Sequence, residues 1–158
     1  MKTSKPVLIG AALASLFLLA VGLFMQHVMK QLPCPLCVLQ RYAFAAIALI
    51  CLTTAALPER ALKGGALLGL LAALSGAGVA AYHIWIMAHP SMSCGIDPLE
   101  TSLNTILTAK LLPFLFFADG LCTTVYPPIL GLSMPQWALV WFTLFAITLG
   151  WVAFKRRR

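Results

Sequence analysis

Residues 7–28 read VLIGAALASLFLLAVGLFMQHV, an uncharged stretch that follows the lysines Lys2 and Lys5. An α-helix needs about 20 mostly apolar residues to cross the hydrocarbon core of a bilayer, so this stretch predicts a transmembrane helix. A cleaved signal peptide would instead have an apolar region of about 7 to 15 residues that ends in a small-residue cleavage site. Here the apolar run is longer and ends in FMQH, which favours a segment that stays in the protein.

Three further apolar runs lie downstream, at residues 38–57, 65–88 and 137–154. The first of them ends at Pro58, a residue that a helix does not readily continue through. The second spaces glycine and alanine so that helices can approach closely within lipid. The last precedes a basic C-terminal tail, which is a strong cytoplasmic stop. The sequence therefore predicts an all-α membrane protein, with one domain over residues 1–158 built as a bundle of four transmembrane helices.

The overall composition agrees with a protein that lies in a bilayer. Of the 158 residues, 61% are hydrophobic and only 9% are charged, whereas an ordinary soluble domain has about 25% charged residues. The net charge of +7 could suggest nucleic-acid binding, but the basic residues flank the apolar runs instead of forming a face with interleaved aromatic residues. We therefore expect membrane lipid, and no nucleic acid, as a partner.

The distribution of Lys and Arg predicts the orientation in the membrane. If both termini are cytoplasmic, eight of the eleven basic residues lie on that side, and only Lys30, Arg41 and Lys110 lie outside. The positive-inside rule selects this arrangement. It places two loops, at about 29–37 and 89–136, on the outer side of the membrane.

The longer outer loop contains the signals of a short helix on the membrane surface. Asp97, Pro98 and Glu100 fit the N-cap, first and third positions of a helix that we expect to run from Pro98 to about Lys110. Apolar residues recur on one face of this segment, and more follow directly. Because the apolar run is short and is broken by Pro113, it predicts an amphipathic surface helix rather than a fifth span.

Four of the five cysteines fall in the predicted outer loops, Cys34 and Cys37 in the first and Cys94 and Cys122 in the second. In an oxidising compartment this distribution indicates disulfides, and a Cys-x-x-Cys pair closes the short loop typical of exchangeable redox cysteines. Four cysteines allow three pairings, and the residues alone leave these open. Cys51 lies within the second span and is expected to act as a small apolar residue.

Two other interpretations of these cysteines compete with a redox role. Both pairs could be inert structural disulfides, or Cys34 and Cys37 could supply thiolate ligands in a metal-binding membrane accessory protein. A zinc site made of four thiolates usually needs two close Cys-x-x-Cys pairs. Because Cys94 and Cys122 are far apart in the sequence, we expect no metal site.

Cys37 precedes or opens the second helix, where exposed N–H groups and the helix macrodipole stabilise a thiolate. Arg41 follows four residues later on the same helical face. Its guanidinium can pair with the Cys37 thiolate or hydrogen-bond a ligand that carries a carbonyl group, or else reach lipid phosphates at the membrane boundary.

Disulfide formation requires a terminal oxidant, because exchange of one disulfide for another leaves the number of electrons unchanged. The sequence has no haem motif, no nucleotide fingerprint and no soluble domain. The acceptor that this architecture offers is therefore a lipid-soluble two-electron carrier, a quinone.

These motifs resemble the DsbB-type disulfide bond formation proteins of bacterial inner membranes. The first-loop motif is CPLC at 34–37 followed by QR at 40–41. The second loop is similar in the segments His83 to Cys94, ADGLC at 118–122 and LGLSMPQW at 130–137. The similarity covers nearly the whole chain.

The resemblance implies a disulfide-generating oxidoreductase whose redox loops face the periplasm, with the disulfides Cys34–Cys37 and Cys94–Cys122. Cys94 would form a mixed disulfide with a periplasmic thioredoxin-like partner of the DsbA type. Cys122 would then attack Cys34, and Cys37 would donate electrons to a membrane quinone, either a ubiquinone or a menaquinone.

The resemblance also assigns residues to the quinone site, namely Cys37, Arg41 and His83. Taken alone, an interfacial histidine such as His83 is more often a structural hydrogen-bonding group. Gln40, beside Arg41, could tune the quinone pocket, and the remaining histidines are expected to lie at the interface.

Overall fold

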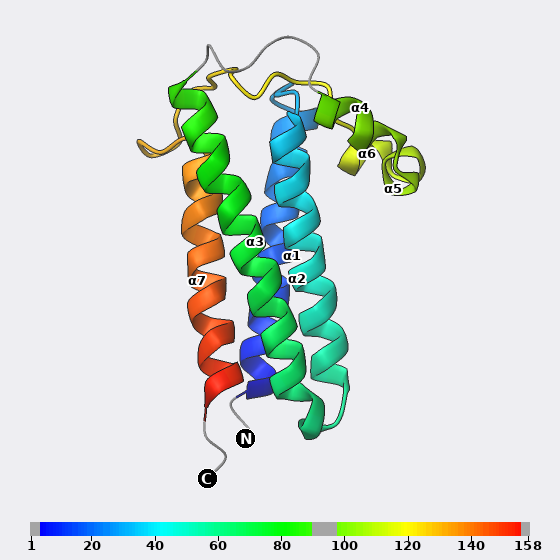
Figure 1. Cartoon of the computed structure of the whole chain (residues 1–158), viewed down its shortest axis with the longest axis vertical. Helices are drawn as coiled ribbons and strands as arrows, with labels where there is room; N and C mark the ends of the chain where they lie inside the picture. Colours follow the sequence, from blue (N-terminus) through cyan, green and yellow to red (C-terminus); the bar gives the residue numbers. More distant parts are fainter. Residues whose placement is uncertain (1–3, 90–97, 156–158) are drawn as a thin grey trace.

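The computed structural model describes residues 4–89 and 98–155, and its main feature is a set of four long helices (Figure 1). These are α1 (Ser4–His27), α2 (Pro35–Ala56), α3 (Leu62–Ala88) and α7 (Met134–Phe154), with the 3-10 turn η1 (Glu59–Ala61) before α3. Each is long and apolar enough to cross a membrane. The predicted fold class, an all-α bundle with four membrane-spanning helices, is confirmed.

The four helices run side by side (Figure 1). The start of α1 and the end of α7 lie at one end of the bundle, and the longer loops lie at the other. The first loop, residues 28–34, joins α1 to α2, and the second loop, residues 89–133, joins α3 to α7. We call the end that carries these two loops the distal end. Both Cys34 and Cys122 lie there, which brings together cysteines from the two halves of the chain.

Each long helix begins three residues before the apolar run from which it was predicted. The start of a helix depends on capping hydrogen bonds, and hydropathy does not register these. In α2, Cys34 is the N-cap and Pro35 follows at the first position. In α7, Ser133 and Gln136 form a capping box, with a proline in the first turn. Both arrangements satisfy N–H groups that a helix leaves unpaired at its start. Hydropathy locates the part of a helix that lipid surrounds, whereas the cap decides where the helix starts.

The core of the bundle combines large and small side chains on the inner helix faces. Phe142 of α7 is fully buried and stacks on Phe44 of α2, with 4.2 Å between ring centroids. Outward-facing residues such as Phe17, Leu68 and Ile147 are large, apolar and exposed. Because lipid offers no hydrophobic drive between helices, close packing has to hold the bundle together.

We expect Gly76→Ala to destabilise the bundle by about 1–3 kcal/mol, the usual cost of overpacking a core. A Cβ at Gly76 would overlap the buried ring of Phe142. Gly78→Ala is the matched control on the same helix, because no atom lies within 4 Å of the added Cβ. Thermal unfolding in detergent measures both variants. Equal stability of the two would contradict this account of the contact between α3 and α7.

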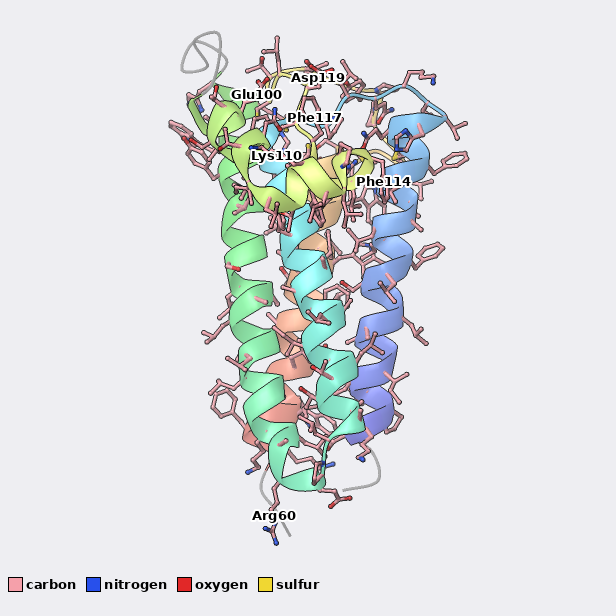
Figure 2. All side chains as sticks on the ribbon, turned by 90° about the vertical axis from the view of Figure 1, so that its right-hand side faces the viewer. Arg60, Glu100, Lys110, Phe114, Phe117 and Asp119 are labelled. Atoms are coloured by element: carbon pink, nitrogen blue, oxygen red, sulfur yellow. The ribbon has the colours of Figure 1, made fainter. Side chains whose placement is uncertain are left out.

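The surface segment of the second loop differs from the prediction. Instead of one helix from Pro98 to about Lys110, it forms three short helices, α4 (Pro98–Thr105), α5 (Leu107–Leu111) and α6 (Pro113–Phe116). The break comes at Ile106, whose backbone is extended, with φ −65° and ψ 142°. Figure 2 shows these helices lying across the distal end of the long helices. The predicted N-cap Asp97 lies outside the described residues.

Specific contacts fix these short helices to the bundle. Tyr42 of α2 shares a 2.6 Å hydrogen bond with the Thr108 hydroxyl and stacks on Phe116, with 4.1 Å between ring centroids. The Asn104 amide pairs with the backbone N–H and C=O of Ala118, at 2.9 and 2.8 Å. The segment that leads to Cys122 is therefore anchored before it reaches the site.

Candidate functional site

The Cys-x-x-Cys motif forms the N-terminus of α2. Cys34 is the N-cap, and its sulfur accepts a hydrogen bond from the Cys37 backbone N–H at 3.3 Å. Cys37 lies in the first turn, and the two sulfurs are 2.9 Å apart. The exposed N–H groups of the helix start thus favour negative charge on either sulfur during exchange.

The second loop is joined to the first loop directly beside this motif. The backbone N–H groups of Asp119 and Gly120 both donate to the Pro33 carbonyl, at 3.0 and 3.2 Å. Gly120 comes so close to the first loop that a Cβ would lie 2.5 Å from the Leu32 carbonyl oxygen. Only glycine allows this approach, which seats Cys122 against Cys34 (Figure 2 labels Asp119 at the distal end).

Cys122 and Cys34 share a small buried cluster with Leu36 and Ile86. A hydrogen bond from the Cys34 thiol lowers the pKa of Cys122. The pKa of Cys34 is raised, first by this hydrogen bond to Cys122, then by the hydrogen bond to Cys37, and then by burial. The thiolate is the nucleophile in disulfide exchange. In the reduced form, negative charge is therefore favoured on the Cys122 sulfur over the Cys34 sulfur.

Cys94 lies outside the described residues, so the Cys94–Cys122 pairing remains a prediction. Cys51 is buried inside α2, beside Gly69 of α3. Its position agrees with the expected role of a small apolar residue.

Helix α3 contributes His83, which is only 3% exposed. Its Nε2 lies 3.7 Å from the Cys34 sulfur and 3.3 Å from the Cys122 carbonyl oxygen. Its Nδ1 lies 3.4 Å from the side-chain nitrogen of Gln40, which is also buried. The residues His83 and Gln40, which lie 43 positions apart, therefore form one polar chain that ends at the cysteines.

Arg41 points into the bundle rather than toward lipid phosphates. Its guanidinium donates to the Gly22 carbonyl at 3.2 Å, to the Leu115 carbonyl at 3.0 Å and to the side-chain oxygen of Gln26. It is 9% exposed. Three of its five N–H donors are thus occupied by acceptors in the described part of the chain, which leaves two for a ligand.

Sequence reasoning missed Gln26 as a site residue. The signal was present, because a polar side chain near the end of an apolar span marks a functional candidate. Gln26 also follows Gly22 by one helical turn, so both of these Arg41 acceptors lie on the same face of α1.

A cavity of about 320 Å³ opens beside Cys37 and Arg41. Its walls come from α1, α2, α7 and both loops, and its aromatic lining residues are Phe17, Phe44, Tyr126, Trp137 and Trp141. Gln26, Gln31, Gln40 and Arg41 supply polar groups to a lining that is otherwise largely apolar. Small-ligand sites are typically apolar cavities with a few oriented polar groups. This cavity therefore suits a flat apolar molecule that carries hydrogen-bond acceptors.

We expect Gly120→Ala to slow cross-linking between Cys34 and Cys122 by about tenfold, equivalent to about 1.4 kcal/mol of distortion in the contact between the loops. The background is a protein with Cys37→Ser and Cys94→Ser, in which a mild oxidant forms this bond and a non-reducing gel measures it. Val125→Ala is the control, since that side chain is 75% exposed. An unchanged rate would show that the close approach does not position Cys122.

Comparison with known proteins gives the family of the chain. The family model described as "Disulfide bond formation protein DsbB" matches residues 4–152. A disulfide bond formation protein B of Herminiimonas arsenicoxydans is 68% identical over 157 residues, covering 99% of each chain. That of Cupriavidus necator is 44% identical, covering 98% of this chain and 96% of the relative. The resemblance inferred from the motifs is thus confirmed, and the chain belongs to the DsbB family of disulfide bond formation proteins.

Proposed function

We propose that this multi-pass membrane oxidoreductase oxidises a periplasmic dithiol protein of the DsbA type and passes the electrons to a quinone in the bacterial inner membrane. Membership of the family makes it a disulfide-forming protein. The observation that supports the finer proposal is the position of Cys37, which contacts Cys34 and also lines the apolar cavity. One residue thus joins the exchanging sulfurs to a site for a lipid-soluble acceptor.

The exchange begins from an oxidised form with the disulfides Cys34–Cys37 and Cys94–Cys122. A partner thiolate attacks Cys94, which forms a mixed disulfide and releases Cys122 as a thiolate. Cys122 then attacks Cys34, forming a Cys34–Cys122 bond and releasing the Cys37 thiolate. The contact between Cys122 and Cys34 supports this step.

The remaining steps return the second loop to its starting state. The second thiol of the partner attacks its own mixed disulfide, so that the partner leaves oxidised and Cys94 becomes a thiolate. Cys94 attacks Cys122 in the Cys34–Cys122 bond, which re-forms Cys94–Cys122 and frees Cys34. Two electrons have then moved from the partner to Cys34 and Cys37, and the number of disulfides in the whole system is unchanged.

The cavity fits a quinone ring by size, by its apolar and aromatic lining and by its donors. Arg41 and Gln26 would hold a carbonyl oxygen, while the aromatic side chains would contact the faces of the ring. When bound, a quinone supplies an acceptor for two electrons and two protons. His83, 3.7 Å from the Cys34 sulfur, is placed to hold a proton released from the cysteines.

Anaerobic titration of the reduced, purified protein with quinone tests the proposal. Two thiols should disappear for each quinone reduced, as counted by thiol-trapping gels and quinone absorbance. Persistent thiols would refute the assignment of the acceptor. Labelling cysteines from each face of intact membranes tests the orientation, since the motif must react from the periplasmic side.

We expect Cys94→Ala to reduce oxidation of the partner to the background rate, because the sulfur that receives the partner is lost. Direct oxidation of Cys34 and Cys37 by quinone should continue, since neither sulfur is altered. The redox state of the partner on a thiol-trapping gel measures the first effect, and quinone absorbance measures the second. Wild-type oxidation of the partner would show that the order of exchange is wrong.

A further inference from the structure

The sulfurs of Cys34 and Cys37 and one ring nitrogen of His83 all lie within 4.8 Å of one another. From the sequence alone we expect no metal site, because a four-thiolate site needs a second close Cys-x-x-Cys pair. Packing of α3 against α2 instead adds an imidazole to the first pair. Two thiols and one imidazole form a donor set that zinc prefers, and Cys₂His is found in natural zinc sites.

We propose that the reduced protein binds a thiophilic divalent cation of the zinc type through Cys34, Cys37 and His83. In tetrahedral zinc sites, bonds of about 2.3 Å to sulfur and about 2.0–2.1 Å to nitrogen place neighbouring ligand atoms about 3.5–3.8 Å apart. The Cys34 sulfur and His83 Nε2 already have this spacing, at 3.7 Å. The two sulfurs, at 2.9 Å, need to separate by less than about 1 Å.

The space for the cation is a cavity of about 40 Å³ that all three ligands line. A single water needs roughly 10–15 Å³, so this volume holds one ion with one further ligand. Three protein ligands leave the fourth tetrahedral position open to water. Cys37 lines both this cavity and the larger one beside Arg41, whereas Cys34 and His83 line only the smaller one.

Gln40 supports His83 as a ligand. A histidine that binds metal through one ring nitrogen almost always hydrogen-bonds a neighbour through the other. The Gln40 amide lies 3.4 Å from His83 Nδ1, and both side chains are buried. The side-chain nitrogen of Gln40 faces Nδ1, so the amide must turn over to present its oxygen to the Nδ1–H when Nε2 binds the cation. Nε2 must at the same time leave the Cys122 carbonyl oxygen, which is 3.3 Å away.

Only the reduced motif can bind, because a disulfide has no thiolate to offer. Binding releases the two thiol protons and leaves the oxidation state of both sulfurs unchanged. A cation bound in the smaller cavity would hold the Cys37 sulfur away from the larger one. This inhibition of electron delivery depends on the proposed function, whereas the binding itself does not.

Cobalt titration of the full-length protein in detergent, reduced anaerobically with a phosphine, tests the site. We expect one equivalent of Co²⁺ to give sulfur-to-cobalt charge-transfer absorption and the ligand-field bands of a tetrahedral ion, and Zn²⁺ to remove them. Protein oxidised beforehand should give neither. The absence of these bands in reduced wild-type protein would overturn the proposal without reliance on any variant.

Variants identify the ligands. Loss of an outer partner costs about 10–100-fold in metal affinity, which is the effect expected of Gln40→Leu, and His83→Asn should cost more than that. His89→Asn is the matched control, because His89 is an exposed histidine at the C-cap of the same helix. An unchanged affinity in His83→Asn would overturn the assignment of the third ligand.

A turnover assay separates this inference from the proposed function. Zn²⁺ should slow quinone reduction by the wild-type protein, and a chelator should restore it. If the metal-free protein does not reduce quinone, the proposed function is wrong. The cobalt spectra still show whether the cation binds to Cys34, Cys37 and His83. If Zn²⁺ binds without slowing turnover, the inferred competition between cation and acceptor is wrong.

Discussion

Replacing Cys37 with serine is expected to reduce quinone reduction by the purified protein to the uncatalysed rate. Cys37 contacts Cys34 and also lines the cavity that would hold the acceptor. A serine hydroxyl cannot form a disulfide with Cys34, and it has no accessible anion comparable to a thiolate. The measurement is the anaerobic absorbance change of quinone in the presence of reduced partner protein.

A second readout makes this prediction specific. With Cys37 absent, Cys34 keeps its contact with Cys122. The Cys34 thiolate should attack Cys122 in the Cys94–Cys122 disulfide, which releases the Cys94 thiolate, and the resulting Cys34–Cys122 disulfide should accumulate on a non-reducing gel. Cys51→Ala is the matched control, because Cys51 is buried deeper in the same helix and touches neither the motif nor the cavity. Wild-type turnover in the Cys37→Ser protein would eliminate Cys37 as the donor.

Replacing Arg41 with leucine is expected to lower kcat/KM for quinone by about 10- to 150-fold. This range converts the 1.5–3 kcal/mol that a hydrogen bond to a charged group typically contributes. Arg41 lines the cavity, and two of its five N–H donors have no acceptor among the described residues. Gly22, Gln26 and Leu115 accept hydrogen bonds from the other three and hold the guanidinium in place. Steady-state kinetics over a range of quinone concentrations separates KM from kcat.

Arg41→Lys should recover only part of the loss, because an ammonium keeps the charge but not the planar fork of donors. Lys110→Ala is the matched control, since Lys110 is an exposed cation on the neighbouring helix α5. If Arg41→Leu lowers the thermal stability but leaves KM unchanged, Arg41 serves only to join α1, α2 and α6.

The long helices could be predicted from sequence because hydropathy summed over about 20 residues outweighs local detail. Their starts could not, since Cys34 and Ser133 act as caps through hydrogen bonds that hydropathy does not register. The break at Ile106 was missed for a related reason. The helical spacing of apolar residues continues through it, while tertiary contacts of Thr108 and Asn104 select three short helices.

Within the site, short-range spacing was informative and long-range packing was not. The pair Cys34 and Cys37, and the position of Arg41 one turn later, could be predicted from local geometry. The contact of His83 with Gln40 depends on how α3 packs against α2. The position of Cys122 beside Cys34 depends on the close approach of Gly120 to the first loop. Such contacts arise only when distant segments meet, so a single sequence does not encode them as a pattern.

The joint between the two loops also bears on selectivity toward small reductants. With the N–H groups of Asp119 and Gly120 bonded to the Pro33 carbonyl, the residues Cys34 and Cys122 are only 3% and 8% exposed. A low-molecular-weight thiol in solution therefore cannot reach these two residues, and it does not reduce them directly. Under the proposed function, quinone is then consumed in oxidising proteins that can dock on the second loop, and not in oxidising small thiols.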